Sequence, residues 1–105
     1  MEKLSKEEIT LIFLKDSKKL KDEILYGNVP KSDEIRTLIC DLGDHQCAYY
    51  YAYCVDKSPH PYTRQAACKD PGWAYSYARY IDKSPRSDTR QAVQKDPKWK
   101  ERYEK

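Results

Sequence analysis

The segment 56–73, DKSPHPYTRQAACKDPGW, returns further along the chain as the segment 82–99, DKSPRSDTRQAVQKDPKW. The two segments are identical at 12 of 18 positions, far more than chance allows at one offset. Self-similarity with a period of about 20 to 50 residues is typical of proteins built from stacked structural repeats. The sequence therefore predicts a repeat protein with a 26-residue unit.

The same register divides the 105 residues into four units. Units 55–80 and 81–105 carry the full motif, unit 29–54 keeps part of it, and 1–28 has lost it. End units of such arrays usually differ from inner ones, because their outer face meets water. We therefore expect a single helical-repeat domain over 1–105, in which 1–28 is a degenerate N-terminal cap unit.

Each full unit contains one Ser-Pro and one Asp-Pro step, and both are typical of helix starts. Ser and Asp side chains accept hydrogen bonds from free backbone N–H groups, and proline suits the first helical position. In unit 55–80 these steps predict helices over 59–68 and 71–81. In unit 29–54 the apolar pattern favours a first helix shifted by one residue. The predicted fold is all-α, a small α-solenoid of about four two-helix, 26-residue repeats.

Packing faces follow from the spacing of apolar residues. Four residues of the second helix in unit 55–80 recur at the spacing of one helical face: Ala74, Tyr77, Ala78 and Ile81. Trp73 and Tyr80 flank this stripe, and we expect both to pack against neighbouring helices. In the cap unit, Ser5 and Glu8 form a capping-box pattern, and Gly27 closes a second helix over 18–26.

Composition and charge narrow the class of protein. Net charge is +3, with +2 in unit 55–80 and +3 in unit 81–105, well short of the dense Lys/Arg clustering of a dedicated nucleic-acid binder. The longest uncharged apolar run, 48–55, is too short to cross a membrane. The first residues are partly acidic, unlike a secretory signal. We expect a cytoplasmic protein that does not bind membranes.

The four cysteines invite a metal or disulfide interpretation: Cys40, Cys47, Cys54 and Cys68, with His45 and His60 nearby. Zinc sites usually contain closely paired ligands such as C-x-x-C, which this sequence lacks. The 26-residue register instead aligns Cys40, Cys47 and Cys54 with the packing positions 66, 73 and 80. We therefore predict free buried thiols, with no metal and no cofactor; a disulfide or zinc site is the alternative.

Catalytic patterns are also missing from the sequence. With only three glycines there is no Gly-rich phosphate loop, and no Ser-His-Asp or Cys-His arrangement can be recognised. Asp70 and Asp96 are explained as helix N-caps. We predict that the chain is not an enzyme.

Tyrosine supplies ten of the thirteen aromatic residues. In the repeat register Tyr49 aligns with Tyr75 and Tyr53 with Arg79, on what we expect to be one outward face. Tyrosine and arginine are enriched in binding hot spots, so these four residues are predicted to contact a partner. The alternative is that the rings only cover neighbouring helices.

Arg64 and Arg90 occupy equal positions in successive units. Solenoids often bind through such aligned rows, and we add both arginines to the predicted partner-binding residues. The alternative is an internal ion pair with Asp56 or Asp82.

The motif D-K-S-P-x-x-x-T-R-Q-A-x-x-K-D-P-x-W resembles short helical repeats of uncharacterised phage, giant-virus and bacterial proteins. It is more loosely similar to leucine-rich-repeat-variant and HEAT-like solenoids. The resemblance covers 55–105 well, 29–54 partly and 1–28 hardly at all. It implies a helical-repeat fold and carries no catalytic residues. By analogy, it implies a viral accessory protein that binds and modulates or inhibits a host defence protein, in the host cytoplasm.

The predicted function is therefore protein–protein binding. The alternative is single-stranded nucleic-acid binding, in which tyrosines stack on bases and the basic C-terminal half follows the phosphates. The charged C-terminal helix, 97–105, is typical of a solvated end, so we expect a monomer or a compact homodimer rather than open-ended stacking.

Overall fold

The computed structural model describes residues 3–104, and within that range every regular element is helical. Over the same range, eight α-helices and two π-helical segments follow one another along the chain. Their bounds are α1 Lys6–Lys15, α2 Ser17–Leu25, α3 Asp33–Asp41, α4 His45–Tyr50, η1 Tyr51–Asp56, α5 Pro61–Ala67, α6 Pro71–Tyr77, η2 Ala78–Asp82, α7 Ser87–Val93 and α8 Pro97–Glu104. The all-helical class predicted from the sequence is confirmed. The last residue of the predicted helix 97–105 lies outside the described range.

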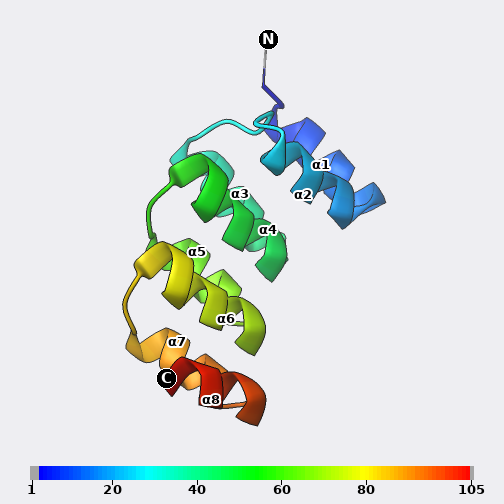
Figure 1. Ribbon diagram of the computed structural model, residues 1–105. Helices are drawn as coiled ribbons and strands as arrows, with labels where there is room; N and C mark the ends of the chain where they lie inside the picture. The colour runs from blue at the N-terminus through cyan, green and yellow to red at the C-terminus, as the bar shows by residue number, and fades with distance from the viewer. Residues whose placement is uncertain (1–2, 105) are drawn as a thin grey trace.

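The helices are arranged in four consecutive pairs, from α1/α2 at one end to α7/α8 at the other (Figure 1). The second helices contact each other in chain order, α2 with α4, α4 with α6 and α6 with α8. The first helices do so from α3 to α5 and from α5 to α7. The pairs therefore lie side by side along the 43 Å axis of the molecule, with the core between successive pairs.

The helix starts predicted from the Asp-Pro step and from the capping box are confirmed, whereas the start predicted from the Ser-Pro step is wrong. Asp70 caps α6 as expected, because its Oδ2 accepts a hydrogen bond from the Trp73 N–H at 3.0 Å. The Ser5–Glu8 capping box is also present at the start of α1. By contrast, helix 59–68 begins two residues later than predicted, at Pro61, and its N-cap is His60, whose Nδ1 accepts from the Tyr62 N–H.

The late start has a backbone cause. Lys57 adopts a left-handed conformation with φ 54°, which ends η1 before the Ser-Pro step. The Ser58 hydroxyl then donates back to the Asp56 carbonyl at 3.3 Å and caps nothing ahead of it. Lys83, with φ 57°, ends η2 in the same way before α7. The Ser-Pro steps therefore belong to the loops between helices.

The register of α3 also differs from the prediction. The N-cap of α3 is Ser32, and the N-cap of α5 is His60, so these two helix starts are further apart than the 26-residue period. The shift is two residues, not the one predicted. As a result Ile35 and not Thr37 takes the buried place that Thr63 has in α5.

The predicted packing stripe of the second helix is confirmed, since Ala74, Tyr77, Ala78 and Ile81 are all buried. Tyr77 has a further role through its hydroxyl, which lies 2.7 Å from Thr63 Oγ1 and accepts from the His60 N–H at 2.9 Å. Tyr51 fastens the loop before α3 in the same manner, accepting from the Ser32 N–H at 3.1 Å. These buried hydroxyls tie α4/η1 to the start of α3 and α6 to the start of α5.

Candidate functional site

An aromatic cluster joins α4/η1 to α6. The Tyr49 ring stacks on the Tyr53 ring at 6.0 Å between centroids and lies 5.0 Å from Trp73. Tyr50 completes the cluster, 5.3 Å from Tyr49 and 5.7 Å from Trp73. Offset-stacked and edge-to-face rings at these separations attract one another beyond simple area burial. The Tyr49 ring therefore packs against the Tyr53 ring as well as against α6.

Within this cluster, only one of the two predicted tyrosines faces solvent. Tyr53 is 53% exposed, but Tyr49 is only 6% exposed because Trp73 and Tyr50 cover it. Burial raises the pKa of Tyr49 to about 12. The expectation that Tyr49 lies on an outward surface is wrong, and the packing alternative holds for this ring.

Tyr75 and Arg79 come together on α6/η2. Arg79 Nη1 donates to the Tyr75 hydroxyl at 2.7 Å, and its guanidinium also lies 5.6 Å from the centre of the Tyr80 ring. Arg79 is exposed, while Tyr75 is half-buried against Trp99 at 5.2 Å. The arginine is thus held between two tyrosines with its charge accessible to solvent.

Tyr80 is a surface residue that the repeat pattern places among the packing positions. It was expected to pack beside the stripe, yet it is 51% exposed. Tyr80 lies in the π-helical turn η2, Ala78–Asp82, where Ala78 and Ile81 stay buried and Tyr80 faces solvent. Apolar spacing alone does not signal such a turn.

Arg64 and Arg90 have different surroundings despite their equal positions in the repeat. Arg64 Nε and Nη2 donate to the two carboxylate oxygens of Asp82 at 2.9 and 2.6 Å, and both side chains are almost fully buried. Arg90 is exposed and makes no ion pair within the described residues. Arg64 is therefore engaged internally, as in the alternative left open by the sequence, and Arg90 alone faces solvent.

Two neighbouring grooves open beside the π-helical turns. The first, which we call the Lys57 groove, has a volume of about 330 Å³ and is lined by Ala52, Tyr53, Lys57, Ser58, Pro59, Tyr80, Ile81 and Lys83. The second, the Arg79 groove, has a volume of about 310 Å³ and is lined by Tyr75, Ala78, Arg79, Lys83, Ser84, Pro85, Arg102 and Tyr103. Both volumes are at the lower end of those found in ligand-binding pockets. The predicted residues Tyr53, Tyr75 and Arg79 thus line adjoining hollows.

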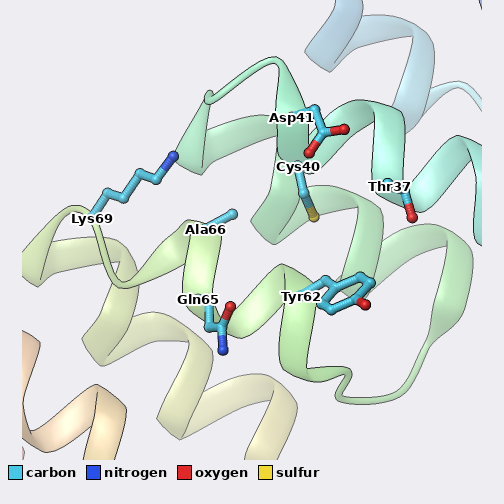
Figure 2. A pocket seen from close by; sticks show the side chains of 7 residues that line it. All are labelled: Thr37, Cys40, Asp41, Tyr62, Gln65, Ala66 and Lys69. Atoms are coloured by element: carbon cyan, nitrogen blue, oxygen red, sulfur yellow. The ribbon is translucent and has the colours of Figure 1, made fainter.

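A third pocket lies between α3 and α5 (Figure 2). Its volume is about 390 Å³, and its lining includes Asp41, Lys69 and Cys40. The two charged side chains have opposite signs, so they give the pocket no net charge. Burial raises the pKa of the Cys40 thiol to about 11, which keeps it protonated and poorly nucleophilic at neutral pH.

All four cysteines are free thiols, and Cys47 is buried while the other three are half-buried. Burial raises the pKa of Cys47 to about 12 and that of Cys68 to about 11. Among residues 3–104, no three His, Cys, Asp or Glu side chains are grouped to hold a metal ion. None of the described helices is long and apolar enough to cross a membrane.

Comparison of the chain with models of protein families, with curated proteins and with solved structures gives no match in any of the three.

Proposed function

We propose that this chain is a short α-solenoid that acts as a non-enzymatic binding module for another protein. The observation that carries the proposal is the exposed aromatic and cationic surface formed by Tyr53, Tyr80 and Arg79. Tyrosine and arginine are the residue types that most often dominate binding energy at protein interfaces. The side-by-side helix pairs support the solenoid interpretation, since solenoids bind partners along rows of equivalent helices.

Preorganisation of these side chains supports the same proposal. Tyr53 stacks on the buried Tyr49 ring, and Arg79 is held by the Tyr75 hydroxyl. Immobilising a free side chain on binding costs roughly 0.5–1.5 kcal/mol, and a side chain already held in place avoids most of that cost. The surface is therefore suited to binding before any partner arrives.

The test compares the wild-type protein with the double variant Tyr53→Ala/Tyr80→Ala in affinity capture from a bacterial lysate, read by mass spectrometry. Tyr62→Ala is the matched control, because Tyr62 is also 53% exposed but lies on α5 beside the pocket of Figure 2. We expect a defined protein that wild type and Tyr62→Ala retain and that the double variant loses. Equal capture by all three proteins would refute the assignment of the surface.

Single-stranded nucleic-acid binding is the second candidate. It is favoured by the cations around Trp99, where the Arg102 guanidinium and Lys98 Nζ lie 5.2 and 5.3 Å from the ring centre. Capture that disappears after nuclease treatment, together with an affinity that falls steeply with added salt, would support this candidate. Capture that survives nuclease supports protein binding.

Modulation or inhibition of a host defence protein remains a prediction from the resemblance to phage and giant-virus repeats. The identity of the captured protein tests it. A defence enzyme whose activity falls when the purified chain is added would support inhibition, and unchanged activity would contradict it.

A further inference from the structure

The two grooves are successive versions of one site. Lys83 lines both, so they adjoin. Four residues of the Lys57 groove have identical counterparts one full repeat later in the Arg79 groove: Ala52 with Ala78, Lys57 with Lys83, Ser58 with Ser84, and Pro59 with Pro85. A ligand that occupies both grooves therefore meets the same exposed Lys-Ser-Pro segment twice.

Every charged side chain that lines the grooves is a cation: Lys57 and Lys83 in the first, Arg79, Lys83 and Arg102 in the second. The carboxylates that precede the two lysines in the chain do not offset this charge. Asp56 is buried and paired with Arg36, and Asp82 is buried and paired with Arg64. The grooves thus present positive charge without a neighbouring anion among their lining residues.

The backbone at the two lysines is an independent observation. Lys57 and Lys83 have φ of 54° and 57°, in the left-handed region where a side chain costs roughly 1 kcal/mol relative to glycine. Glycine ends helices in this way elsewhere in the chain, at Gly27 and Gly43, both with φ 82°. At both positions the lysine side chain lines a groove, so the strained backbone places a cation there.

We infer that the paired grooves bind an extended acidic segment of a partner protein, with one apolar side chain in each groove and carboxylates against the lysines and arginines. The inference rests on the proposed function and names the partner's chemistry. Pro59 and the exposed rings of Tyr53 and Tyr80 supply the apolar wall of the first groove. Pro85 and the half-buried rings of Tyr75 and Tyr103 supply that of the second. Charge complementarity of this kind steers association and fixes register.

The observations favour a peptide over a single-stranded nucleic acid. The four groove cations are fewer than the roughly six to ten phosphate contacts of a typical nucleic-acid interface. The two exposed rings that line the Lys57 groove are also partly occupied, Tyr53 by the stacked Tyr49 and Tyr80 by Arg79. Base stacking needs free ring faces, whereas an aliphatic side chain needs only the apolar wall.

The spacing between the two grooves determines the spacing of apolar residues in a test peptide. Neighbouring packed helices are about 8–10 Å apart, and a polyproline II chain brings every third residue to the same side after about 9 Å. A fluorescein-labelled Glu-Glu-Leu-Glu-Glu-Leu-Glu-Glu peptide therefore offers one leucine per groove. The same peptide with lysine in place of glutamate, and labelled oligothymidylate of about ten nucleotides, complete the set of probes.

The experiment measures fluorescence anisotropy with full-length protein. Wild type is expected to bind the acidic peptide, to bind the lysine peptide at least about tenfold more weakly, and to lose affinity when salt screens the charges. Lys83→Glu should weaken binding of the acidic peptide at least about tenfold. Lys69→Glu makes the same charge change beside the pocket between α3 and α5 and should alter affinity less than about twofold.

A second variant separates binding from folding. Lys57→Gly/Lys83→Gly removes both cations and relieves both left-handed residues, so it should weaken peptide binding while the melting temperature stays level or rises. No binding of the acidic peptide to wild type, equal binding by Lys83→Glu, or tighter Lys83-dependent binding of oligothymidylate would each overturn the inference. If peptide binding fails but lysate capture still depends on Tyr53 and Tyr80, the inference is wrong and the proposed function stands.

Discussion

At the scale of the residue, Arg36 shows how burial decides the strength of an ion pair. Its Nη1 donates to Asp33 at 2.6 Å, and its Nε and Nη2 donate to the two oxygens of Asp56 at 2.8 and 2.7 Å. The side chain of Asp33 is 94% exposed and that of Asp56 only 2%. One arginine therefore has one solvated carboxylate partner and one buried partner at nearly equal distances.

This contrast yields a prediction about stability. Asp56→Asn leaves the buried guanidinium with only the solvated Asp33 as charge partner and should lower the free energy of unfolding by about 3 kcal/mol. Asp33→Asn, the matched control on the same arginine, should cost less than about 1 kcal/mol because water already screens that pair. Urea unfolding at neutral pH measures both. Equal losses in the two variants would contradict the assignment of Asp56 as the structural partner.

Arg64 illustrates why the candidate site was only partly predictable. Its identity with Arg90 in the repeat is visible in the sequence, but its partner Asp82 lies 18 residues away, at the end of a π-helical turn. Whether an arginine faces solvent or closes an internal pair depends on that distant geometry. The same holds for Tyr49 and Tyr53, which lie one helical turn apart and differ because Trp73, on another helix, covers only the first.

At the scale of the element, helix ends were predicted well where the cap is local and poorly where it is not. Asp70 caps α6 through a hydrogen bond to the nearby Trp73 N–H, as its Asp-Pro step indicates. The Ser-Pro steps failed as caps because Lys57 and Lys83 turn the chain first. A left-handed residue is hard to foresee when it is lysine, since glycine is the usual residue there.

The left-handed lysines lead to a prediction at this scale. Lys83→Gly should raise the free energy of unfolding by about 1 kcal/mol, because glycine adopts φ 57° without the steric cost of a side chain. A gain of that size corresponds to a rise of roughly 4–8 °C in melting temperature. Lys95→Gly is the control, since Lys95 is not among the positive-φ residues. Glycine there should increase the entropy of the unfolded chain and therefore lower the melting temperature. A lower melting temperature for Lys83→Gly would contradict the strain argument.

At the scale of the whole molecule, buried tyrosines recur along the stack of helix pairs. Burial raises the pKa of Tyr51 and Tyr77, and it raises that of Tyr49 to about 12. Each phenol is therefore more easily ionised in the unfolded chain than in the folded protein. These tyrosines belong to the hydrophobic core clusters that hold neighbouring helices together. Ionisation of their hydroxyls should therefore destabilise the packing between helices.

This arrangement predicts alkaline sensitivity. The folded-state pKa values are raised, so the stabilisation is complete below the unfolded value of about 10 and is lost as pH rises through the folded values. We expect the urea midpoint to fall progressively above about pH 10, in step with tyrosinate absorbance. Tyr49→Phe should lose less stability over the same range, since it lacks one of the titrating groups. A midpoint that stays constant through that range would contradict the prediction.

The sequence alone determined the helical class, the 26-residue period, the Asp-Pro and Ser5 caps and the packing stripe of the second helix. Apart from the period, these features depend on residues within one or two helical turns of each other, where spacing and local hydrogen bonding decide the outcome. Only the tertiary structure decided the two-residue shift of α3, the outward position of Tyr80, the burial of Tyr49 and the pairing of Arg64 with Asp82. The physical reason is that exposure and charge pairing depend on which neighbouring helix covers a side chain, and that contact joins residues far apart in the chain.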